Sequence, residues 1–214
     1  MTWLPDNLDV VMRLAGAHVV LAGVPLLVGL LLALPLGWAA HSRERWRPFL
    51  VAGTGLLYTI PSLALFVLMP LLLGTRILDP FNVVVAMTVY TVALLVRTVA
   101  DGLDSVPDEV TAAATAMGYG GLALALRVDL PLAVPVIAAG LRVAAVSNVS
   151  IVSVASLIGV QQLGVLLTDG YARNFPEVLW VGILACLLLA LAFDLVILVV
   201  ARVLTPWARV GVAR

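Results

Sequence analysis

Long apolar runs separated by short polar stretches dominate this sequence. Five of these runs reach the length of about 20 residues that a helix needs to cross the hydrocarbon core of a bilayer. They cover residues 17–40, 49–73, 82–100, 132–158 and 176–204. Prolines and glycines inside the runs predict kinks, which membrane helices tolerate when their neighbours satisfy the freed backbone groups. The pattern predicts an all-α fold, a polytopic bundle of about five transmembrane helices that forms one domain over residues 1–214.

One stretch between the third and fourth runs breaks this pattern. Residues 101–131 carry several acids and then turn to alanine, threonine and glycine, with EVTAAATAMGYGG at 109–121. Acids in a first turn and a series of alanines favour a short helix, for which Ser105 is the expected N-cap and Gly118 the expected stop. A solvated connector is one interpretation. However, ordinary helix connections have about 2 to 8 residues, so the length favours a docking element.

The arginines orient the predicted spans. Three of them follow the first run, in HSRERWR at 41–47, and with five alternating spans the same side also carries Arg97, Arg127, Arg202, Arg209 and Arg214. Because short cytoplasmic loops carry an excess of basic residues, this side is predicted to be cytoplasmic. The N-terminus is then outside, and both the C-terminus and residues 101–131 are inside.

The composition limits the kinds of binding site that the chain can form. The chain is 63% hydrophobic and 11% charged, with a mean hydropathy of +1.17, so a lipid bilayer is the expected solvent for most of it. It has no lysine, which excludes a P-loop lysine for ATP. Cys186, His18 and His41 are the only residues of their types, so no metal site, cofactor or intrachain disulfide is expected. The net charge of zero gives no sign of a nucleic-acid partner.

The unusual stretch resembles the EAA loop of ABC importer permeases, in which E-A-A-x-x-x-G is followed at a distance by L-P. Ala112 stands where the glutamate is usual, and the matching positions are Ala113, Ala114, Gly118, Leu130 and Pro131. The segment IVSVASLIGVQQLGVLLTDG at 151–170 resembles the segment that follows the fourth span in this family, with glutamines in place of two glycines. TIPSLALF at 59–66 resembles the second span of the osmoprotectant branch.

This resemblance implies a type I importer permease fold and a division of labour between subunits. A coupling helix would lie in a groove of a separate ABC ATPase subunit, through Glu109, Ala112, Ala113, Ala114, Met117, Gly118 and Tyr119. It also implies a second permease copy or paralogue, an extracytoplasmic substrate-binding protein and a place in the bacterial plasma membrane. The expected cargo is a small compatible solute such as glycine betaine, choline or carnitine, and the chain itself is expected not to be an enzyme.

Polar residues inside the predicted spans are candidates for an intramembrane ion pair and for the translocation path. Arg142 and Asp194 lie at similar depths in the fourth and fifth runs, and ionisable groups in a membrane usually face a partner. We expect them to pair, the alternative being that each reaches water separately. The candidates for the translocation path are Tyr58, Ser62, Ser147, Asn148 and Ser150. Serines also favour close helix packing, and aromatic residues also anchor helices at the interface, so both structural interpretations stay open.

Three rival functions remain on sequence grounds. The first keeps the ABC permease family and changes the cargo to methionine or another amino acid. The second is a secondary transporter, although the inverted repeats common in such proteins are not evident. The third is an intramembrane protease, for which the sequence offers no GxSxG elbow and no histidine close to the serines of the fourth run.

Overall fold

The computed structural model describes residues 3–43 and 45–207, and their regular elements are all helical. In chain order these are α1 (Trp3–Asp6), α2 (Leu8–Ser42), α3 (Arg47–Tyr58), α4 (Ser62–Leu73), α5 (Pro80–Asp104), α6 (Asp108–Ala116), α7 (Gly121–Leu124), the π-helix η1 (Ala125–Asp129), α8 (Leu130–Ser153), the 3-10 helix η2 (Val154–Ile158), α9 (Gly164–Ala172) and α10 (Pro176–Leu204). Arg209 and Arg214, used above for orientation, lie outside the described residues.

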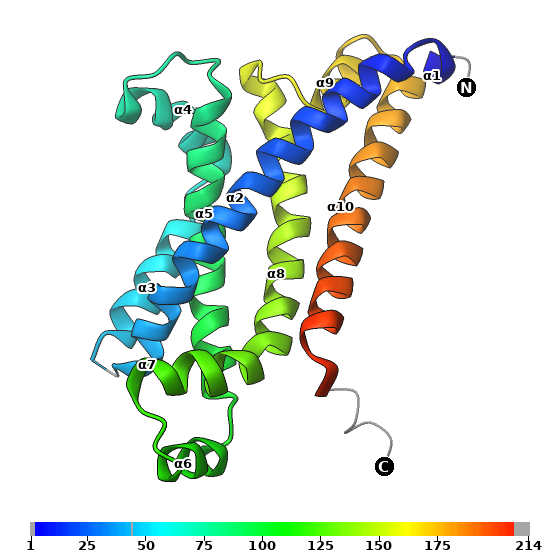
Figure 1. Cartoon of the computed structure of the whole chain (residues 1–214). Helices are drawn as coiled ribbons and strands as arrows, with labels where there is room; N and C mark the ends of the chain where they lie inside the picture. Colours follow the sequence, from blue (N-terminus) through cyan, green and yellow to red (C-terminus); the bar gives the residue numbers. More distant parts are fainter. Residues whose placement is uncertain (1–2, 44, 208–214) are drawn as a thin grey trace.

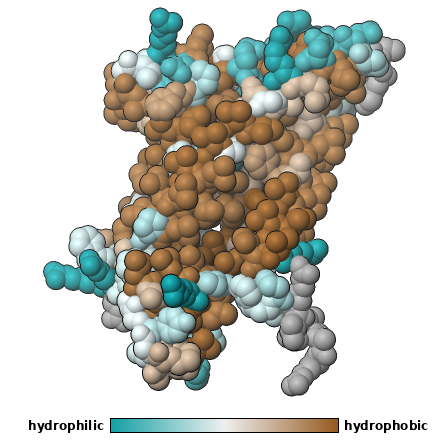
Figure 2. Space-filling view, in the orientation of Figure 1, coloured by the Kyte–Doolittle hydropathy of each residue, from teal (hydrophilic) through white to brown (hydrophobic). Residues whose placement is uncertain are grey.

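Four helical stretches are long and apolar enough to cross a membrane: α2, α5, the continuous run Gly121–Ile158 that contains α8, and α10. The pair α3–α4 forms a fifth if it is counted as one bent span. In Figure 1, α2 runs obliquely across α5 and α8, while α6 projects from one end of the bundle. Figure 2 shows an apolar belt between two ends that carry most of the hydrophilic colour. The expected all-α bundle of about five membrane helices is confirmed.

The expected second span is broken rather than continuous. Its two halves, α3 and α4, meet at an angle of 100° around Thr59–Pro61. Pro61 explains the break, because proline has no N–H to donate and disfavours a helical conformation in the residue before it. The carbonyl of Ile60 accepts a hydrogen bond from the hydroxyl of Tyr90 on α5 instead. The first span is also longer than expected, since α2 begins at Leu8.

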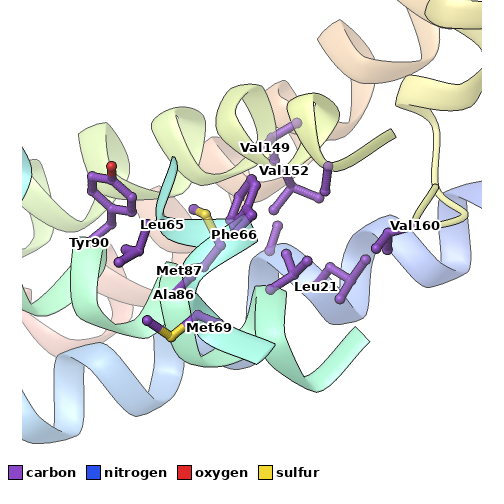
Figure 3. Packing of buried hydrophobic residues seen from close by; sticks show 13 residues of the cluster. Leu21, Leu65, Phe66, Met69, Ala86, Met87, Tyr90, Val149, Val152 and Val160 are labelled. Carbon is purple, nitrogen blue, oxygen red and sulfur yellow. The ribbon is translucent and has the colours of Figure 1, made fainter. Parts of the chain in front are cut away.

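The apolar core follows the interfaces of α2 with its neighbours. In one half of the bundle, Phe66 of α4, Met87 of α5 and Val149 of α8 are fully or almost fully buried in one cluster with Leu21 of α2 (Figure 3). A second cluster joins α2, α5 and α8 nearer to α6, around Val99. The second cluster therefore fixes the ends of α5 and α8 from which the loop containing α6 departs.

Candidate coupling site and translocation path

Helix α6 begins and ends on local signals. Pro107 occupies its N-cap position, and Asp108 and Glu109 lie in its first turn, where the helix dipole favours acids. At its other end, the N–H of Gly118 donates to Thr115 O at 2.9 Å, and the N–H of Tyr119 donates to Ala114 O at 3.1 Å. This is a Schellman motif, which requires the left-handed backbone that Gly118 adopts at φ 91°.

Ser105 does not cap α6, contrary to the expectation from the sequence. It ends α5 instead, and its hydroxyl donates to Gly102 O at 2.6 Å. The reason is that Pro107 has the extended conformation that precedes a helix, which leaves Ser105 two residues before the N-cap position.

The surface of α6 is left open by the rest of the chain. Ala114 is the one residue of this helix that is buried, and the helix contacts the returning arm formed by α7 and η1. The exposed residues include Glu109, Ala112, Ala113 and Met117, and Met117 is 72% exposed. A helix with small side chains on its free surface allows another backbone to approach closely. The arrangement therefore suits docking into a groove.

A charged cluster ties three helix ends together close to this loop. His41 of α2 contacts Asp104 at 2.6 Å, and Arg47 of α3 pairs with the same carboxylate. Arg47 and Arg97 each lie 3.4 Å from Asp101. The cluster joins α2, α3 and α5 just before the chain enters α6. Sequence reasoning missed this cluster, although the grouping of these charges at the ends of three predicted spans was a visible signal.

Arg142 of α8 and Asp194 of α10 form a bidentate ion pair. The Nε of Arg142 donates to Oδ1 of Asp194 at 2.6 Å, and one of its terminal nitrogens donates to Oδ2 at 2.9 Å. The fork of a guanidinium matches both oxygens of a carboxylate, which makes this the strongest geometry for such a pair. It links α8 to α10 within the apolar belt.

The path candidates fall into two separate groups. The first group lies beside the α3–α4 break, where Tyr58 is 41% exposed and half-buried Ser62 begins α4. The ring of Tyr58 meets that of Tyr90 edge to face, with centroids 5.6 Å apart. On α8, Ser147 is half-buried and Ser150 is exposed. Asn148 is buried and does not face an open path in the single chain.

Asn148 instead links three helices. Its amide donates to the hydroxyl of Thr91 on α5 at 2.9 Å and to the carbonyl of Ala22 on α2 at 3.3 Å. A buried amide with these partners specifies how α8 packs against α2 and α5.

Comparison with known proteins decides the family. The family described as the binding-protein-dependent transport system inner membrane component matches residues 26–210. A relative from Salmonella typhimurium, named the osmoprotectant import permease protein OsmW, is 34% identical over 209 residues, which cover 95% of this chain and 96% of the relative. The chain belongs to this family of transport components.

Two further comparisons place this permease among its relatives. The glycine betaine/carnitine/choline transport system permease protein OpuCB of Bacillus subtilis is 27% identical and is matched over 96% of this chain and 94% of its own. A solved structure of the MetNI methionine ABC transporter, in an inward-facing conformation, superposes with a TM-score of 0.84. The superposition covers 94% of this permease and 98% of the chain in the solved structure. Because the identity is 19%, the match supports the fold alone.

The structure also reveals two buried polar residues in the permease, whose hydrogen bonds to α8 the sequence analysis did not predict. His18 of α2 is fully buried, with its Nε2 3.0 Å from the carbonyl of Val149. Gln162 is also fully buried, and its amide donates to Ser153 O at 3.3 Å. Both satisfy carbonyls of α8 near its change to the 3-10 helix. Polar residues in an otherwise apolar run were the available signal for them.

Proposed function

We propose that this chain is the permease subunit of an ABC importer for osmoprotectant solutes such as glycine betaine, choline or carnitine. The observation that carries the transport role is the open surface of α6 at the end of a membrane bundle of this family. The solute class rests on the names of relatives that match over most of their length, among which osmoprotectants recur.

In this proposal, α6 lies in a groove of a separate ATPase subunit. The exposed residues Ala112, Ala113 and Met117 meet the ATPase, Glu109 adds a charge at the helix start, and Gly118 with Tyr119 fixes the helix end. Closure of the ATPases on nucleotide moves α6. The cluster of His41, Arg47, Asp101 and Asp104 passes that movement to α2, α3 and α5, because it joins their ends.

The same proposal places the N-terminus and α9 outside the cell and α6 in the cytoplasm of a bacterium. One bundle encloses little space, so a second permease, identical or paralogous, completes the path. Tyr58, Ser62, Ser147 and Ser150 are candidates to line it, since all four are at least partly exposed in the single chain. A substrate-binding protein delivers the solute to the outer end.

The test is uptake of labelled solute by proteoliposomes that contain this chain, its ATPase and a loaded binding protein. We expect glycine betaine, choline or carnitine to drive uptake and to stimulate ATP hydrolysis. Ala113→Trp should abolish both, because a bulky ring on α6 keeps the groove from closing on the helix. The matched control is Ala192→Trp, on an exposed alanine of α10 to which the proposal assigns no partner.

Two outcomes would contradict the proposal. If Ala113→Trp transports and stimulates hydrolysis as well as the unmodified chain, α6 is not the coupling helix. If only methionine or another amino acid drives uptake, the family role holds and the solute class is wrong.

A further inference from the structure

A pocket of about 260 Å³ opens at the end of the bundle opposite α6, and the transport role proposed above makes no use of it. It lies between the start of α2, helix α9 and the start of α10. Buried Leu14 of α2 and Leu166 of α9 contribute apolar surface to it. Its remaining lining includes aromatic rings and charges of both signs, which distinguishes it from the apolar grooves lower in the bundle.

One aromatic wall of this pocket is fixed by long-range contacts. The backbone N–H of Trp3 donates to the carboxylate of Glu177 on α10 at 3.0 Å. The amide of Asn7 donates to the carbonyl of Trp3 at 2.9 Å. These bonds hold α1 against α10, so that Trp3 lines the pocket together with Phe175, which lies just before α10.

The charges of the pocket lie beside these rings. Asp169 of α9 and Arg173, the residue that follows α9, face each other at 3.8 Å, and their side chains are 52% and 75% exposed. An exposed pair at that distance contributes little stability, so a ligand can replace it at small cost. Arg13 of α2 adds a second guanidinium to the lining.

We propose that this pocket binds a small zwitterion that carries both a substituted ammonium and a carboxylate, such as glycine betaine. A cation above an aromatic face is attracted by the ring, and Trp3, Phe175 and Asp169 supply two rings and a negative charge for the ammonium. Arg13 and Arg173 supply the donors for the carboxylate. The choice of solute rests on the function proposed above, whereas the preference for a zwitterion rests on the pocket itself.

The two halves of the proposed site make separate predictions about specificity. Choline carries the ammonium and lacks the carboxylate, so it should bind more weakly than glycine betaine. Arg13→Gln should reduce that preference, because it removes one of the carboxylate's partners and leaves the ammonium's partners unchanged.

The experiment is equilibrium binding of labelled glycine betaine to the full-length chain in nanodiscs of phosphatidylglycerol, without any binding protein. Asp169→Asn and Phe175→Leu should each weaken binding by about fivefold, the value of one cation contact. The matched control is Tyr171→Ala, which removes an 83% exposed aromatic ring from the same helix α9 outside the pocket. Binding that is absent, or equal in all three variants, overturns the proposal.

A lipid headgroup with an ammonium and a phosphate offers similar chemistry. Nanodiscs that contain phosphatidylcholine distinguish the two sources. Glycine betaine binding that persists there supports a solute site, and binding that disappears assigns the pocket to the headgroup. A chain that imports glycine betaine with its binding protein but does not bind it alone overturns this inference and leaves the proposed function intact.

Discussion

The membrane bundle and helix α6 are held in shape by different forces. In α5, 13 of 25 residues are buried against other helices, whereas in α6 one residue of nine is buried. The conformation of α5 depends on residues distant in the sequence. That of α6 depends on its own caps and leaves its surface free for a partner. Substitutions should therefore destabilise the bundle when they disturb contacts between helices, and should disturb α6 when they change its local backbone.

The largest effect is expected when the ion pair between α8 and α10 is reversed on one side. Arg142→Asp places two carboxylates face to face within the apolar belt, where ionisable groups depend on their partners. We expect loss of folded protein, measured as the monodisperse fraction after extraction in mild detergent. The double variant with Asp194→Arg should recover it, and Arg76→Asp at an exposed loop is the control. Failure of the double variant to recover would show that the pair is not what stabilises this interface.

The next largest effect concerns the packing of α2 on α5. A Cβ at Gly37 would lie 3.0 Å from the carbonyl of Val96 and closer still to the side chain of Val99. Gly37→Leu should therefore destabilise the bundle by about 3 kcal/mol, since overpacking typically costs 1–3 kcal/mol and here forces two helices apart. Gly16→Leu is the control on the same helix, because nothing lies within 4 Å of its Cβ. Thermal unfolding of both variants measures the difference, and similar unfolding temperatures would contradict this account.

A smaller effect is expected at the break between α3 and α4. Tyr90→Phe removes the hydroxyl that donates to Ile60 O and leaves this carbonyl without its partner. An unsatisfied buried polar group costs about 1–3 kcal/mol, and this contact is only partly buried, so we expect a cost near the lower end of that range. Tyr58→Phe is the control, since it removes a hydroxyl from the other ring of the same edge-to-face pair. Thermal unfolding should fall for Tyr90→Phe and stay near that of the unmodified chain for Tyr58→Phe. A reversed order would mean that Tyr90 does not hold the break.

These contrasts also explain which features were predictable from the sequence. Hydropathy and length predict about five membrane helices, because each span must satisfy its own backbone groups in lipid. Matching depths bring Arg142 opposite Asp194, since few positions in an apolar belt can accommodate a charge. The end of α6 at Gly118 follows from a local backbone preference.

Other features depend in part on contacts between distant elements. Pro61 is a local signal for a kink between α3 and α4, but hydropathy alone predicts one continuous span, and the 100° turn also involves the hydrogen bond from Tyr90 of another helix to Ile60 O. Asn148 is an acceptable candidate for a polar path until the structure shows Thr91 and Ala22 as its partners. The roles of the α6 residues remain predictions, because the surface that would contact them belongs to another subunit.

The smallest effect on stability is expected at the end of α6, where a substitution should leave the stability of the bundle unchanged. Gly118→Ala forces a residue with a side chain into the left-handed conformation and should destabilise the end of α6 by about 1 kcal/mol. Gly120→Ala, two residues later, has an ordinary φ of −143° and open space around its Cβ, and it serves as the control. Thermal unfolding of the bundle should be unchanged in both, because α6 contributes little to the core. ATP hydrolysis by the reconstituted complex should fall in Gly118→Ala alone. If the bundle unfolds earlier in that variant, α6 is coupled to the core more tightly than its single buried residue indicates.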